Sequence, residues 1–113
     1  MVKSVASKSG NKVYIIQSID RKLPLEDIAM AKDLDMDQLL TEMEAIVSTG
    51  TRLNLGYYIS ENLDPEVVQE LYDWFKNDAA SDSLADARAE LSADYEDIEI
   101  RLIRLKFLCE VAN

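Results

Sequence analysis

The side chains that could do chemistry in this sequence are mainly carboxylates, because the chain has 22 Asp and Glu residues, no His and one Cys. Without His, a Ser–His or Cys–His nucleophile pair cannot form, and the usual imidazole base is missing. The same shortage of His and Cys excludes a structural zinc site. No Gly-rich run precedes a Lys-Ser or Lys-Thr pair, so there is no phosphate-binding loop. These features argue against a stand-alone enzyme.

Closely spaced carboxylates occur at several places along the chain. Glu96 and Glu99 could place two acids on one helical face, as a metal site or an acid–base pair requires. With so many acids, such pairs arise by chance, and we interpret them as solvated faces. The run Asp33-Leu34-Asp35-Met36-Asp37 resembles the start of a calcium loop but lacks the required Gly and the distal Glu. The sequence therefore predicts no catalytic residue and no metal site.

The charge is unevenly distributed along the chain, whose 12 basic and 22 acidic residues give a net charge of −10. Residues 1–60 hold seven basic and eight acidic side chains, whereas residues 61–113 hold five and fourteen. Nucleic acid would repel the second half, since a duplex carries one negative charge per ~1.7 Å. The basic candidates for DNA contact therefore lie in the first half: Lys12, Arg21, Lys22, Lys32 and Arg52.

Apolar spacing in the first half predicts a helix–turn–helix. A helix over residues 12–21 is followed by a short helix that begins at Pro24. The Leu34 side chain is then expected to be buried in a turn, Asp35 caps the next helix, and Gly50 ends that helix. In this arrangement the second helix can lie in a major groove.

The groove-facing side of that second helix contains few residues suited to base recognition. Its members are Met36, Asp37, Gln38, Thr41, Glu42, Ala45 and Ser48. Base readout relies on Arg, Lys, Asn and Gln, so Gln38 is the main candidate, with Thr41 as a second polar contact. Two interpretations stay open: direct DNA binding, or a helix–turn–helix used for packing or protein contact.

The second half also reads as mostly helical, after a stretch with strand character at residues 51–59. That stretch could form a short wing, and Tyr57-Tyr58 could stack on bases or serve a core or interface. Helices are expected at about 65–77, 84–91 and from Ser92 or Asp94 to 111. The last is apolar nearly all round, so it is either the central helix or a face for another domain or a second copy. Trp74-Phe75 and Cys109 are interpreted as core or interface residues.

The length of 113 residues suits one domain, and the composition is that of a mostly α globular protein of five or six helices. Residues 1–11 are rich in Ser, Lys and Gly, and we expect a linker or disordered start that suggests a piece of a longer protein. Residues 12–113 are then one helical domain, with the helix–turn–helix and possible wing at 12–59 and an acidic helical part at 60–113. Neither a membrane span nor a signal peptide is evident, and a single Cys fits the reducing cytoplasm.

Three segments resemble the C-terminal helix–turn–helix region of RecQ-type ATP-dependent DNA helicases from bacteria related to Bacteroides. They are KVYIIQSIDRKLPLEDIA at 12–29, EAIVSTGTRLNLGYYI at 44–59 and EDIEIRLIRLKFL at 96–108. The resemblance covers almost all of residues 12–113. It implies a parent 3′–5′ helicase, driven by ATP hydrolysis, that acts in repair and recombination in the nucleoid. It also implies that ATP, magnesium and zinc are bound only by upstream domains.

Two functions therefore compete. In the first, the chain is a C-terminal accessory domain that helps a RecQ-like helicase engage DNA through its basic residues. In the second, the acidic half is a protein-interaction module that contacts the helicase core or a basic repair partner, with no DNA affinity of its own. A DNA-binding module would lose affinity steeply with salt, whereas an interaction module would ignore DNA.

Overall fold

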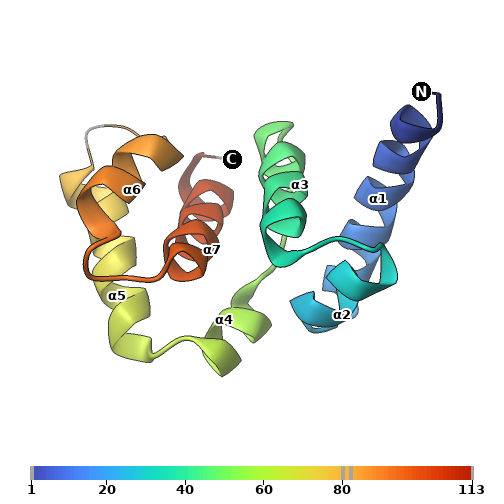
Figure 1. The fold of residues 1–113 in the computed structure, drawn as a ribbon. Coiled ribbons are helices and arrows are strands. Elements are labelled where there is room, and N and C mark those ends of the chain that lie inside the picture. The colour runs from blue at the N-terminus through green and yellow to red at the C-terminus, as the bar shows by residue number, and fades with distance from the viewer. Residues whose placement is uncertain (1, 80, 82, 113) are drawn as a thin grey trace. The chain divides into compact units, whose positions relative to one another are not determined.

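The structure, a computed structural model, describes residues 2–79, 81 and 83–112, with side chains described for 11–79, 81 and 83–111 (Figure 1). Within them the regular elements are α1 (Val2–Asp20), α2 (Leu25–Ala31), α3 (Met36–Ser48), α4 (Gly56–Asn62), α5 (Pro65–Asp73), α6 (Leu84–Leu91) and α7 (Asp97–Phe107). Single π-helical turns at Trp74–Asp78 and Leu108–Ala112 continue α5 and α7. The predicted mostly α fold is confirmed, and the described residues contain no strand.

The chain divides into two compact units, Met1–Asn54 and Leu55–Asn113. The sequence predicts one helical domain over residues 12–113 with a division after residue 59, whereas the structure divides the chain after Asn54. Each unit has its own buried apolar side chains.

The first unit contains α1, α2 and α3, which pack against one another. Ile15 and Ile19 of α1, Ile28 of α2 and Leu39 and Met43 of α3 are among its buried side chains. These are the positions whose helical spacing predicted the helix–turn–helix, and that motif is confirmed.

Each of the three helices is followed, two residues after its last residue, by a residue with a left-handed backbone. Lys22 (φ 62°), Asp33 (φ 57°) and Gly50 (φ 96°) follow α1, α2 and α3. After α1, the Leu23 N–H donates to the Ser18 carbonyl at 3.1 Å, and after α2 the Leu34 N–H donates to the Ala29 carbonyl at 2.8 Å. This 6→1 hydrogen bond is the Schellman motif, which closes a helix and reverses the chain. Gly50 was predicted as such a stop, but no comparable sequence signal marks Lys22 or Asp33.

The predicted linker or disordered start differs from the structure, in which the backbone of residues 2–11 belongs to α1. A helix is costly to nucleate but cheap to extend, because each added residue gains one hydrogen bond. The firmly packed turns around Ile15 and Ile19 can therefore propagate the helix toward the N-terminus through residues whose composition alone favours a linker.

The wing predicted at residues 51–59 is wrong as a strand. Residues 51–55 have no regular secondary structure, and α4 begins at Gly56. The alternation of Leu53 and Leu55 was read correctly, since both are buried. From Leu55 onward, however, burial follows Tyr58, Ile59 and Leu63, which is helical spacing. That periodicity overrides the β propensity of the tyrosines.

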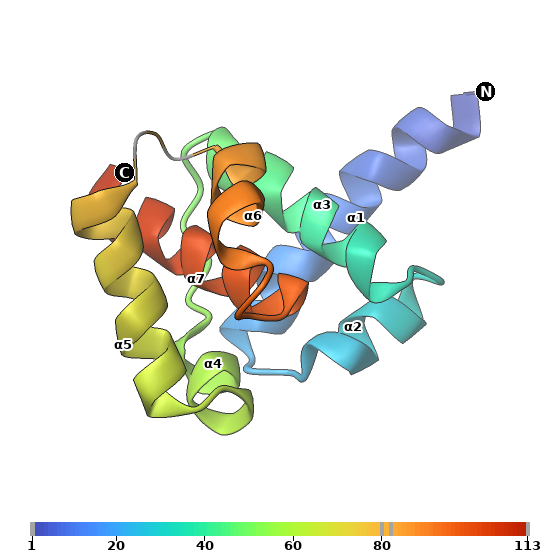
Figure 2. The same ribbon diagram turned by 60° about the vertical axis from the view of Figure 1, so that its left-hand side comes forward.

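The second unit is built around α7, against which α4, α5 and α6 all pack (Figure 2). Ile100, Leu102, Ile103 and Leu105 are fully buried, so α7 is the central helix that one of the two predictions described. Phe75 is buried and stacks on Phe107 at 5.9 Å between ring centroids. Cys109 is also buried, so both residues are core residues as predicted.

We expect Asp33→Gly to raise the free energy of unfolding of the first unit by about 0.5–1 kcal/mol. A left-handed backbone is unfavourable for a residue with a Cβ and comes without strain for glycine. Urea titration followed by circular dichroism measures the change. Asp33→Ala is the matched control, because it removes the same carboxylate but keeps the Cβ, and it should give no gain. A destabilised glycine variant would contradict the expectation.

Candidate functional site

The turn of the helix–turn–helix is fixed at both of its ends. On the α2 side, Asp33 is left-handed and Leu34 folds back onto the Ala29 carbonyl. On the α3 side, the Asp35 carboxylate accepts the Gln38 N–H at 2.7 Å, and the Gln38 side-chain oxygen accepts the Asp35 N–H at 2.9 Å. This reciprocal pair is a capping box, which satisfies helix N–H groups that would otherwise lack partners. The angle between α2 and α3 is thereby set by local hydrogen bonds.

The exposed face of α3 is poorly equipped to read bases. Gln38 and Thr41 are exposed, as predicted for contact residues, but both are engaged locally. The Gln38 oxygen is held in the capping box, and the Thr41 hydroxyl donates to the Asp37 carbonyl at 2.9 Å. The helix also carries three acids (Asp37, Glu42 and Glu44) and no Lys or Arg. Phosphates flanking a groove would therefore meet negative charge along this helix.

The basic candidates lie on other parts of the first unit. Lys12 is exposed on α1, and Arg21 and Lys22 are exposed in the turn after α1. Nine residues separate Lys12 from Arg21, which is about 14 Å along a helix. Lys32, at the end of α2, is half-buried, and its Nζ lies 5.0 Å from the ring centroid of Tyr14 in α1. Arg52 is exposed in the extended segment after α3.

The structure thus distributes the predicted cations over α1 and the segments that follow each helix of the first unit. It does not bring them together on α3, where the helix–turn–helix pattern alone would place DNA contacts. Tyr14 beside Lys32 is a contact that sequence reasoning missed. The two residues are 18 positions apart, and only the return of α2 along α1 makes them neighbours.

The proposed stacking residues Tyr57 and Tyr58 belong to the second unit. Tyr58 is only 3% exposed, so the prediction that its ring stacks on bases is wrong, because it is part of the core. Tyr57 is half-buried, and its ring meets that of Tyr58 edge to face at 6.5 Å. Burial raises the pKa of the Tyr57 hydroxyl.

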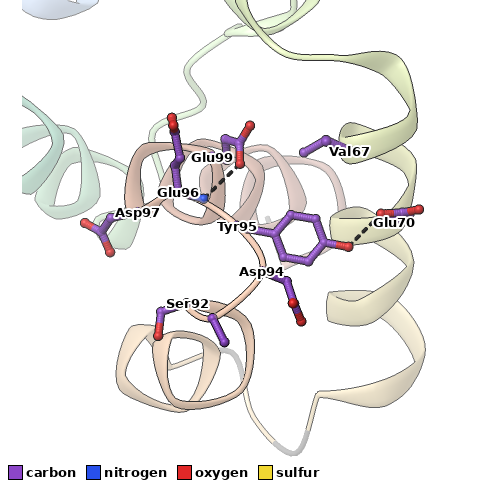
Figure 3. A pocket seen from close by; sticks show the side chains of 9 residues that line it. Val67, Glu70, Ser92, Asp94, Tyr95, Glu96, Asp97 and Glu99 are labelled. Atoms are coloured by element: carbon purple, nitrogen blue, oxygen red, sulfur yellow. Dashed lines mark hydrogen bonds between the residues drawn. The ribbon is translucent and has the colours of Figure 1, made fainter.

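The second unit has an acidic hollow where the end of the α6 segment meets α5 and the start of α7 (Figure 3). Its lining residues are Val67, Glu70, Ser92, Ala93, Asp94, Tyr95, Glu96, Asp97 and Glu99. The Tyr95 hydroxyl points across to α5 and donates to Glu70 at 2.6 Å (Figure 3). This hydrogen bond, with burial and the negative charge of Glu70, Asp94 and Glu99, raises the pKa of Tyr95 to about 12. No local sequence pattern indicates this pair, because Tyr95 and Glu70 are 25 residues apart.

Asp97 at the start of α7 holds two arginines. Arg88 of α6 donates to both of its carboxylate oxygens, at 2.7 and 3.0 Å. Arg101 lies one turn further along α7, 3.7 Å from the same carboxylate, and is buried. The Arg88 hydrogen bond is the main cause that lowers the pKa of Asp97, and the charge of Arg101 acts in the same direction. Asp97 therefore joins α6 to the central helix.

Neither a metal site nor a membrane span is found among the described residues. In the part of the chain that the structure describes, no group of three or more His, Cys, Asp or Glu side chains is arranged to hold a metal ion. None of the described helices has both the length and the apolar character that a membrane span requires. The candidate functional surfaces are therefore the basic positions of the first unit and the acidic hollow of the second.

Comparison with known protein families finds a match that runs from α1 into α4. Residues 9–59 match the family model described as RecQ-1-like, helix-turn-helix domain. The matched region contains all of α2 and α3 and every basic candidate named above. It ends at Ile59, whereas the resemblance seen in the sequence extends into α7. No curated protein matches the sequence.

We expect Asp97→Asn to lower the free energy of unfolding of the second unit by about 1 kcal/mol at pH 7. The magnitude is modest because the side chains of Asp97 and Arg88 are both about half exposed, so that solvent screens their interaction. Because the folded-state pKa of Asp97 lies below its usual value of 3.8, this stabilisation is present above that pH. It is lost as the pH falls through the lowered pKa. Urea titrations at pH 7 and at about pH 3 measure the difference.

Asp94→Asn is the control for this expectation, because it removes an exposed acid three residues before Asp97 that takes no part in the bridge to Arg88. Its effect at pH 7 should be clearly smaller. Equal effects of the two variants, or an Asp97→Asn penalty that persists undiminished at low pH, would contradict the role given to the bridge.

Proposed function

We propose that this chain, whose residues 9–59 form a RecQ-1-like helix-turn-helix domain, is the C-terminal accessory part of a RecQ-like ATP-dependent DNA helicase. On this proposal the parent protein unwinds DNA in the 3′–5′ direction during repair and recombination and works in the cytoplasm, at the nucleoid. ATP hydrolysis with magnesium, and zinc binding, belong to other domains of that protein. The bacterial lineage suggested by the resemblance stays a prediction.

The observation that carries the proposal is the separation of positive charge from α3. Lys12, Arg21 and Lys22 are exposed on α1 and in the turn after it, while α3 has only acidic charge. Such a domain suits contact with phosphates, which carries no sequence information, better than contact with bases. A helicase must move along DNA of any sequence, so a module that holds the backbone without reading bases fits that task.

The size of the effect follows from counterion release. If three cations contact duplex phosphates, affinity falls about 40-fold between 50 and 200 mM salt, since the logarithmic slope is about −0.9 per contact. Loss of one contact reduces this fall to about 12-fold. The salt dependence therefore counts the cations that touch DNA.

The test is fluorescence anisotropy of labelled single-stranded and forked DNA, titrated with the full chain at about 50 and 200 mM salt. Arg21→Ala and Lys12→Ala should each weaken binding several-fold at low salt and reduce the salt slope by about one contact. Lys76→Ala removes an exposed cation from the second unit and should leave both values unchanged. Flat traces at tens of micromolar chain would overturn DNA binding by this domain.

A second candidate function, an acidic protein-interaction module, is favoured by the hollow of the second unit. Five carboxylates line it, and residues 61–113 carry fourteen acids against five basic residues. A basic segment of the helicase core or of a repair partner would be attracted to such a surface. In this case the helix–turn–helix positions the chain and the second unit makes the contact.

We expect a labelled oligo-arginine peptide to bind the chain at low salt and to be weakened roughly fivefold by Asp94→Lys, since one reversed charge at the contact is worth about 1 kcal/mol. Glu61→Lys makes the same charge change on α4, outside the hollow, and should weaken binding less. Equal weakening by both variants would mean that only the net charge matters, which would contradict a specific contact at the hollow.

A further inference from the structure

The helix–turn–helix has a small apolar hollow on the outside of its turn. Six residues from α2, the turn and the start of α3 line a space of about 370 Å³: Glu26, Ala29, Met30, Asp33, Leu34 and Met36. All six belong to the first unit, so the hollow is a feature of that unit alone. We call it the turn hollow.

The apolar residues of the turn hollow are poorly covered. Met30 is 78% exposed, and Leu34 and Met36 are half-buried. Met30 is exposed because the buried face of α2 consists of Leu25, Ile28 and Ala29. Leu34 lies close to Ala29 because the left-handed backbone of Asp33 lets the Leu34 N–H donate to the Ala29 carbonyl. Methionine is flexible and polarizable, and it is over-used on surfaces that accept partner side chains.

The rim of the turn hollow is negative. Glu26 and Asp33 line it. The segment around it, residues 25–37, holds three further acids (Asp27, Asp35 and Asp37) and a single basic residue, Lys32. Lys32 lies over the Tyr14 ring of α1, whereas its neighbour Asp33 lines the hollow. An occupant must therefore bring positive charge as well as an apolar group.

We propose that the turn hollow docks a basic segment of another protein, which inserts one large apolar side chain between Lys or Arg residues. Charge complementarity selects this occupant. DNA phosphates would be repelled by the rim, and a second copy of this chain carries a net charge of −10. The volume is near the lower end of ligand pockets, so it fits one or two side chains rather than a folded element. This docking uses none of the exposed cations assigned to DNA and stands independently of that assignment.

The test uses the methionine methyl groups of the full chain as reporters in ¹³C-methyl NMR. The probe is a short peptide with one leucine flanked by two arginines on each side. Its addition should shift the Met30 and Met36 methyl signals in a saturable way, while Met43, which is 0% exposed in the core, serves as the internal control and stays unshifted. A matched peptide with serine in place of leucine should bind at least fivefold more weakly.

Two variants separate the turn hollow from general attraction. Met30→Lys should weaken the leucine peptide about tenfold, because it removes the apolar contact and adds a repelling charge. Val13→Lys makes the same change at a 55% exposed apolar position on α1 and should weaken it less than twofold. Both positions are exposed, so the variants should remain folded, and the Met43 signal reports on that.

Three outcomes would overturn the proposal. The first is that the Met30 and Met36 signals stay fixed at millimolar peptide. The second is that the serine peptide binds as well as the leucine peptide, and the third is that duplex DNA rather than peptide shifts these two signals. The first outcome would mean that the turn hollow does not bind basic peptides. The second would mean that charge alone attracts the peptide, and the third would mean that the turn binds nucleic acid. None of them bears on whether Arg21 and Lys12 contact DNA.

Discussion

The backbone reversal at Asp33 is the constraint on which the first unit depends. A left-handed residue there lets the Leu34 N–H reach the Ala29 carbonyl, and the capping box of Asp35 and Gln38 begins α3 two residues later. The chain thus passes from one helix to the next within four residues, with both helix ends satisfied by hydrogen bonds. Because the turn is so short, it fixes which side chains of α2 and α3 face inward. The same reversal leaves Met30 outside, so the turn that builds the motif also builds its exposed apolar surface.

Charge then decides what this frame can contact. A helix–turn–helix with lysines and arginines on its second helix would be suited to a major groove, but α3 has three acids and no base. The exposed candidate cations are Lys12 on α1, Arg21 and Lys22 in the turn after it, and Arg52 in the segment after α3. Lys32 lies over the Tyr14 ring of α1. In the second unit the acids are organised in a different way. Asp97 binds two arginines and joins α6 to α7, whereas the Tyr95 hydroxyl donates a hydrogen bond to the Glu70 carboxylate across the acidic hollow.

Much of the fold was predictable because it rests on local signals. Helical spacing of apolar residues, Asp35 as a cap and Gly50 as a stop predict α2 and α3. The wing predicted at residues 51–59 is wrong because it rests on the alternation of Leu53 and Leu55 and on the β propensity of Tyr57, Tyr58 and Ile59. The burial of Leu55, Tyr58 and Ile59 instead follows the helical spacing of α4. The candidate cations were found by charge alone, and the structure leaves all but the half-buried Lys32 exposed. Pairs such as Tyr14 with Lys32, or Glu70 with Tyr95, depend on how helices return past one another, which no local pattern encodes.

These findings separate two properties that a helix–turn–helix usually combines. The frame of the motif is set by packing and capping, and neither requires the second helix to be basic. A sequence can therefore keep the frame while α3 carries acidic instead of basic residues. The surfaces suited to contact with DNA or protein then lie on other parts of the same unit. In this protein the cations of α1 can meet phosphates, while the acidic, methionine-bearing turn favours a basic protein segment. The helix–turn–helix frame thus fixes the shape of the first unit, and the placement of charge on that shape determines which partner each face can accept.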